Sequence, residues 1–231
     1  MSTRSPRILT ALCGILGTAA LVVYFSAVLD PLPPDDASAA QVTVFATRYH
    51  DAILLDVWLQ AIGTLLTVVF VLALVHLAGA ATRFAGRMTL LVSGVILAMS
   101  LAEGTFELAV IQGTASGHPA TAVTGFDLTN VFAHVFLIAP SLFLMLGAAL
   151  LGTQLLPQVF SYLALALGVA FELLGLAGLF SATAVTMVVF LEMAQESWIV
   201  AAAITLVVRA GQPTVAGRGV AQPVAPAGAE S

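Results

Sequence analysis

The stretch "MTLLVSGVILAMSLAEGTFELAVI", residues 88–111, decides the fold because it runs for 24 residues with only two charged side chains. An α-helix rises about 1.5 Å per residue, and about 20 apolar residues are enough to cross the hydrocarbon core of a bilayer. Its two charges, Glu103 and Glu107, stand one helical turn apart near its end. The stretch therefore predicts a membrane-spanning helix that carries carboxylates.

The composition of the whole chain indicates an integral membrane protein. Hydrophobic residues make up 60% and charged residues 8% of the 231 positions, and the mean hydropathy is +1.08. A soluble domain has roughly 45–50% and 25% of these classes. The net charge of -5 reflects twelve acids and seven scattered arginines, which excludes a nucleic-acid partner. The lipid bilayer is the expected partner, and the single cysteine, Cys13, can form no internal disulfide.

Six apolar segments are long enough to span a membrane, and they predict an all-α polytopic bundle. These spans are residues 8–29, 57–80, 88–111, 129–151, 159–181 and 187–208. The first is too long for the apolar part of a signal peptide and is taken as a retained helix. Within the loop that follows it, Asp36 or Ser38 is expected to cap a short helix with Val42 and Phe45 on one face.

The arginines indicate the orientation of the bundle. Six of the seven lie before the first span, between the second and third, or after the sixth, and Arg48 alone lies on the other, acidic side. The positive-inside rule makes the arginine-rich side cytoplasmic, so both termini are predicted to lie on the cytoplasmic side of the membrane. The expected location of the protein is a bacterial inner membrane. Residues 210–231 are rich in Ala, Gly and Pro without periodicity and are predicted to form a disordered cytoplasmic tail.

Six ionisable side chains fall in one band of roughly 15 Å in the outer half of the predicted bundle when their depth is counted along each span. They come from four spans and are Glu103, Glu107, His134, Glu172, Glu192 and Glu196. Glu103 and Glu107 share a helix face, as do Glu192 and Glu196, and Asn130 precedes His134 at the same spacing of four residues. Because a charge facing lipid costs several kcal/mol, we expect these side chains to converge on an interior pocket open to the outside.

The pocket is expected to bind a cation or a small polar ligand. Tyr24 and Gln60 lie at a similar depth on the first two spans and are, with Asn130, the predicted ligand-binding residues. No Lys or Arg lies inside any predicted span to neutralise the acids. Five carboxylates and one imidazole must therefore be protonated, hydrated or compensated by a bound cation.

A metal-dependent membrane enzyme is the sharper form of this hypothesis, because Glu and His on facing helices build carboxylate metal centres. The predicted divalent metal is Zn, Mn or Fe, and Glu172 is the candidate catalytic acid or base. The spacing departs from Glu-x-x-His, since both acidic pairs here are Glu-x-x-x-Glu. The predicted metal ligands are Glu103, Glu107, His134, Glu192 and Glu196.

Two other functions stay open at this point. A proton- or cation-coupled transporter would use the acids to carry its substrate, although the predicted cytoplasmic half has little polar beyond His76. A structural membrane protein would use them as a buried polar network instead. Association into a homo-oligomer is also left open.

The order of these landmarks resembles a family of functionally uncharacterised bacterial six-pass membrane proteins known only as a domain of unknown function. The residues that carry the resemblance are "LLPQVFSYLALALG" at 155–168, "ESWIVAAAITLVV" at 196–208 and the "AEGTFE" of 102–107. The resemblance implies the six-pass topology and singles out Glu196, with Glu103 or Glu107 after it. The basic residue usual just before the acid of the third span is absent here, and no activity is implied.

Overall fold

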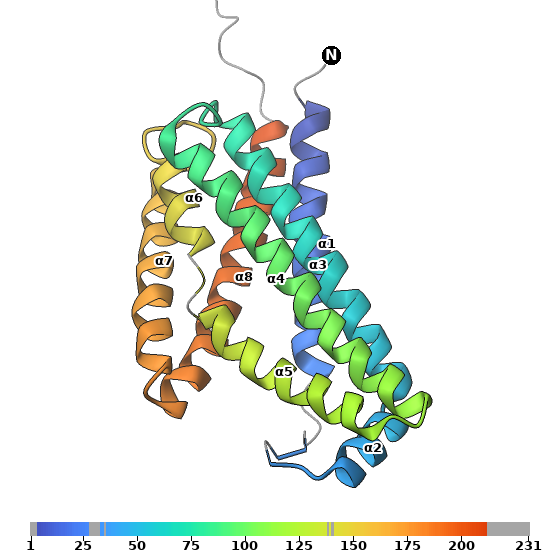
Figure 1. The fold of residues 1–231 in the computed structure, drawn as a ribbon. Helices are drawn as coiled ribbons and strands as arrows, with labels where there is room; N and C mark the ends of the chain where they lie inside the picture. Colours follow the sequence, from blue (N-terminus) through green and yellow to red (C-terminus); the bar gives the residue numbers. More distant parts are fainter. Residues whose placement is uncertain (1–3, 28–32, 35, 138, 140, 212–231) are drawn as a thin grey trace, which may run out of the picture.

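The computed structural model describes residues 4–27, 33–34, 36–137, 139 and 141–211, so the predicted tail beyond residue 211 lies outside the described residues (Figure 1). The described chain is all helical. Its eight helices are α1 (Arg4–Ala27), α2 (Ala39–Arg48), α3 (His50–Leu77), α4 (Phe84–Ala115), α5 (Pro119–Leu137), α6 (Leu142–Leu150), α7 (Gln158–Gly178) and α8 (Ala182–Ala210).

Five of these helices are long and apolar enough to cross a membrane. They are α1, α3, α4, α7 and the part of α8 from Phe190 to Ala210, and they correspond to five of the six predicted spans. Their apolar runs exceed the length that the hydrocarbon core requires, which is why hydropathy alone located them. The helix bounds differ most in α3, which begins at His50, seven residues before the predicted start at residue 57.

The remaining predicted span, residues 129–151, is corrected by the structure. The chain forms two helices there, α5 and α6, and Ser141 is the N-cap of the second. The side chain of Ser141 accepts a hydrogen bond from the backbone N of Leu144 at 3.3 Å. Pro140 in the sequence explains the interruption, because proline lacks a backbone N–H and disfavours a helical residue before it.

The helices run between two ends of the molecule (Figure 1). We call one end the arginine end, because α1 begins there with Arg4, α3 turns into α4 at Arg83, and Arg209 lies in the last turn of α8. Arg209 also joins α8 to the loop after α6, since its Nη1 donates to the carbonyl oxygens of Gln154 and Leu155 at 3.0 and 3.1 Å. The opposite end, which we call the α2 end, holds α2 and the turns from α4 to α5 and from α7 to α8 (Figure 1).

The short helix at the α2 end confirms the predicted cap. Ser38 and Gln41 form a capping box, in which the Ser38 backbone N donates to Gln41 Oε1 at 2.8 Å. Val42 and Ala46 are fully buried and pack against residues of α4 and α5. The helix is therefore held onto the bundle. Beside it, α5 runs obliquely across the molecule from α2 toward α7 and α8 (Figure 1).

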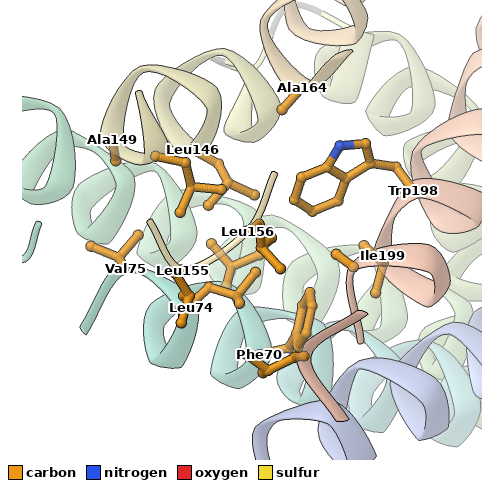
Figure 2. Packing of buried hydrophobic residues seen from close by; sticks show 14 of the residues in the cluster. Phe70, Leu74, Val75, Leu146, Ala149, Leu155, Leu156, Ala164, Trp198 and Ile199 are labelled. Carbon is orange, nitrogen blue, oxygen red and sulfur yellow. The ribbon is translucent and has the colours of Figure 1, made fainter. Parts of the chain in front are cut away.

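The main hydrophobic core lies toward the arginine end, where α3, α6, α7 and α8 meet (Figure 2). Phe70, Leu74 and Leu146 are fully buried there. The indole of Trp198 packs edge-on against Phe143, and its Nε1 donates to the backbone oxygen of Phe160 at 3.0 Å. This packed region forms one side of the cavity described next, because Phe143 and Ile199 belong to both regions.

Candidate functional site

A cavity of about 270 Å³ lies among α1, α3, α4, α6, α7 and α8. Polar side chains from four long helices and from the start of α6 line it together with apolar ones. The polar residues are Tyr24, Gln60, Thr64, Thr67, Ser100, Glu103, Ser141, Glu192, Gln195 and Glu196. The apolar residues include Leu21, Phe25, Val68, Ile96, Phe143, Phe171, Val188 and Ile199.

Helical periodicity explains why these residues share one space. Positions 60, 64 and 67 of α3 lie at spacings of four and three, which place them along one helix face. Positions 192, 195, 196 and 199 of α8 follow the same rule. Each of these two helices therefore turns one face, which carries most of its cavity residues, toward the same space.

Uncharged donors hold two of the cavity carboxylates. Gln60 Nε2 donates to Glu103 Oε2 at 2.6 Å, and Thr18 Oγ1 donates to Glu196 Oε2 at 2.5 Å. Within the described part of the chain the one ion pair joins His50 and Asp51, which are outside the cavity. The carboxylates of Glu103, Glu192 and Glu196 are thus not paired with any described cationic side chain.

Two further polar atoms of the cavity lack a hydrogen bond. Among the described residues, Gln60 Oε1 and Thr67 Oγ1 are buried and have no partner. Gln60 is only 5% exposed and Thr67 only 9%. An unsatisfied buried polar atom costs about 1–3 kcal/mol. A hydrogen-bond partner for either atom would recover that free energy.

The structure brings together five of the predicted site residues. Tyr24, Gln60, Glu103, Glu192 and Glu196 all line the cavity, although they come from four helices far apart in the sequence. The acids among them come from two helices, α4 and α8, whereas the sequence predicted ionisable side chains from four spans.

The other predicted site residues lie elsewhere. Glu107 is not among the cavity residues; its Oε2 is buried without a partner in the described chain, and it interacts electrostatically with Glu103 and Asp56. Asn130 lies on α5 and does not line the cavity. His134 also belongs to α5, but its side chain lies outside the described residues.

Glu172 binds the start of α6. Its Oε1 accepts a hydrogen bond from the backbone N of Ser141 at 2.7 Å, and it does not line the cavity. A carboxylate at a helix N-terminus satisfies a backbone N–H and interacts favourably with the helix dipole. The contact assigns Glu172 a positioning role for α6, and its predicted catalytic role stays a prediction.

Replacing Glu172 tests this positioning role. We expect Glu172→Leu to lower the thermal unfolding midpoint of the purified protein by roughly 5 °C, because the Ser141 N–H loses its acceptor. Glu172→Gln keeps an acceptor oxygen at the same place, so its midpoint should stay within about 2 °C of the wild type. Equal midpoints for the two variants would show that this hydrogen bond does not stabilise the fold.

The described residues contain no group of three or more His, Cys, Asp or Glu side chains that could hold a metal ion. The three cavity acids are therefore not arranged as a ready metal centre. The predicted divalent metal, with His134 among its ligands, stays a prediction.

Several residues of the site were not predicted from the sequence. They are the cavity residues Thr67, Ser100 and Gln195, and Thr18, which donates to Glu196. A signal existed for two of them, because Ser100 precedes Glu103 by three residues and Gln195 follows Glu192 by three. Thr18 had no such signal, since its partner Glu196 lies 178 positions away.

No family model matches this chain, and comparisons with curated proteins and with solved structures found no match.

Proposed function

We propose that this chain is a multi-pass membrane protein that binds a small cation or polar ligand in the cavity lined by Glu103, Glu192 and Glu196. The observation that carries the proposal is that three carboxylates from two helices face one cavity without a described cationic partner. A carboxylate accepts hydrogen bonds and attracts positive charge, so a bound cation is its natural complement.

The chain path supports six crossings of the membrane. α4 ends at the α2 end and α7 begins at the arginine end, so α5 and α6 together must carry the chain from one end to the other (Figure 1). In this proposal the interrupted pair α5–α6 is the fourth of the six crossings in chain order. Both termini then lie on the side of the arginines, which is the cytoplasmic side by the positive-inside rule. The membrane in this proposal is a bacterial inner membrane.

The depth of the cavity supports access from the outer side. Gln60 lies ten residues after the start of α3 at the α2 end, which corresponds to about 15 Å along the helix. The main hydrophobic core fills the region between the cavity and the arginine end. A ligand therefore meets fewer packed side chains when it arrives from the α2 end.

Cation-coupled transport is a second candidate, favoured by the interruption between α5 and α6. Discontinuous helices often form the substrate sites of secondary transporters, and Ser141, Leu142 and Phe143 at the start of α6 line this cavity. The same cavity residues serve both candidates, because a transporter must first bind its substrate.

Ligand-dependent stability tests the proposal. Purified protein in lipid nanodiscs is heated with Na⁺, Ca²⁺, Mn²⁺, Zn²⁺, methylammonium or guanidinium. A ligand at 100 times its dissociation constant stabilises the folded state by about 2.7 kcal/mol, so at least one of these cations should raise the midpoint by roughly 5–10 °C.

Variants connect that shift to the cavity. Glu103→Gln should weaken binding of the active cation by at least about tenfold, since one charged hydrogen bond contributes about 1.5–3 kcal/mol. Asp51→Asn is the matched control, because Asp51 is a fully exposed acid at the start of α3. The proposal is overturned if no cation in the set shifts the wild-type midpoint, or if Asp51→Asn abolishes the shift as Glu103→Gln does.

A further inference from the structure

We infer that the ligand is a small lipophilic amine, bound as a primary or secondary ammonium whose N–H groups are donated to Glu103, Glu196 and Gln60. This inference rests on the proposed function, since it names the class of cation that the same cavity takes.

Unused hydrogen-bond acceptors carry the first step. The carboxylates of Glu103, Glu192 and Glu196 offer six oxygens, and only two of these oxygens accept a hydrogen bond from another described residue. Gln60 adds a buried amide oxygen without a described partner. Acceptors of this kind are satisfied by a ligand that carries several N–H donors.

The geometry of Gln60 strengthens this step. Its Nε2 already donates to Glu103, and its Oε1 belongs to a side chain that is 95% buried and lines the cavity. The oxygen itself is enclosed by protein atoms next to Gly104, so the amide must rotate to turn it toward the cavity. In the inferred complex an ammonium group replaces Nε2 as the donor to Glu103 and donates a second N–H to the rotated amide oxygen.

The apolar walls define the rest of the ligand. Phe25, Phe143, Phe171 and Val188 line the same cavity as the acids. These side chains cannot coordinate a metal ion or hydrogen-bond to its water shell, whereas they gain free energy by covering a hydrocarbon body. One charged, donor-rich pole and one apolar pole are the two parts of a lipophilic amine.

The volume of the cavity limits the size of this amine. At about 270 Å³ the cavity is slightly below the roughly 300–1,000 Å³ of ligand pockets. A single six-membered ring with a short aminoalkyl arm meets this limit.

A quaternary ammonium ion fits the chemistry less well. Proteins bind such ions through faces of aromatic rings, and they carry no N–H donor. A quaternary ion would leave Gln60 Oε1 and most of the carboxylate oxygens without hydrogen bonds. Discrimination between ammonium and trimethylammonium is therefore the property that separates this inference from general cation binding.

Three ligands with the same benzyl body test the inference. Benzylamine supplies charge and N–H donors, benzyltrimethylammonium supplies charge alone, and benzyl alcohol supplies a neutral donor. Each is titrated calorimetrically into the protein in nanodiscs, with empty nanodiscs as the control for partition into lipid. We expect benzylamine to bind at least about tenfold more tightly than either analogue, the loss of about one charged hydrogen bond.

A matched pair of variants locates the effect. Gln60→Met removes the buried acceptor and should weaken benzylamine binding by about tenfold, whereas Gln112→Met changes an exposed glutamine on α4 and should leave it unchanged. The wild-type comparison of the three ligands decides the inference even if Gln60→Met does not fold.

The outcomes separate the two proposals. Equal or tighter binding of benzyltrimethylammonium, or equal binding of benzyl alcohol, overturns the inference. So does a failure of all three ligands to bind while an inorganic cation still stabilises the protein, and the proposed function then stands. If neither the benzyl ligands nor any cation binds, the proposed function fails as well.

Discussion

A valine at Gly168 should lower the thermal unfolding midpoint of the protein by roughly 6–12 °C. A Cβ atom at this position of α7 would lie 2.3 Å from the backbone N of Leu144 and 2.5 Å from its Cα. Both atoms belong to the backbone of α6 and cannot turn away as a flexible side chain can. Overpacking costs about 1–3 kcal/mol, a backbone clash belongs at the upper limit, and each kcal/mol shifts the midpoint by about 2–4 °C.

The matched control is Gly94→Val in α4. Nothing lies within 4 Å of a Cβ built at Gly94, which is also exposed within a long helix. Both substitutions change a helical glycine to valine, so their effects on helix propensity are the same. Differential scanning fluorimetry in detergent measures the two midpoints. Similar midpoints for the two variants would contradict the close contact between α6 and α7.

The double variant Glu103→Gln/Glu196→Gln should show a large effect in the opposite direction. We expect its midpoint, measured at alkaline pH without added ligand, to rise by roughly 4–8 °C. Glutamine keeps an oxygen that can accept from Gln60 and from Thr18, but it removes two charges that have no described cationic partner. Relief of about 2 kcal/mol of desolvation and repulsion accounts for the shift.

This result distinguishes a binding site from a structural network. When a residue is kept for function at the expense of stability, its replacement raises the stability of the protein and abolishes binding at the same time. A structural network predicts that the double variant unfolds at a lower temperature than the wild type. Glu172→Gln serves as the control, because its carboxylate binds Ser141 and lies outside the cavity.

Hydropathy was sufficient to predict most of the fold. A run such as residues 88–111 must lie in lipid or in a protein core whatever its tertiary contacts, and the structure has α4 over that run. The cap at Ser38 is likewise a local feature, set by Ser38 and Gln41. The break between α5 and α6 was missed because an average over residues 129–151 stays apolar despite one proline.

The candidate site was predictable only in part. Spacing along a helix places Glu192 and Glu196 on one face, and both line the cavity. It does not say which neighbour that face meets. Glu172 lies one turn after Gly168, and both meet α6, so the close packing of α6 and α7 turns this acid to the start of α6. Such a contact depends on the interruption before Ser141, which hydropathy could not show.

The depth of Glu103 has an electrical consequence. It lies twelve residues before the end of α4 at the α2 end, or about 18 Å along the helix. In the proposed orientation, a cation that reaches it from outside crosses roughly half of the membrane voltage, which contributes about 1 kcal/mol per 100 mV for a unit charge. An interior-negative potential would thus tighten binding by roughly fivefold, and an energised cell would hold the ligand longer than a depolarised one.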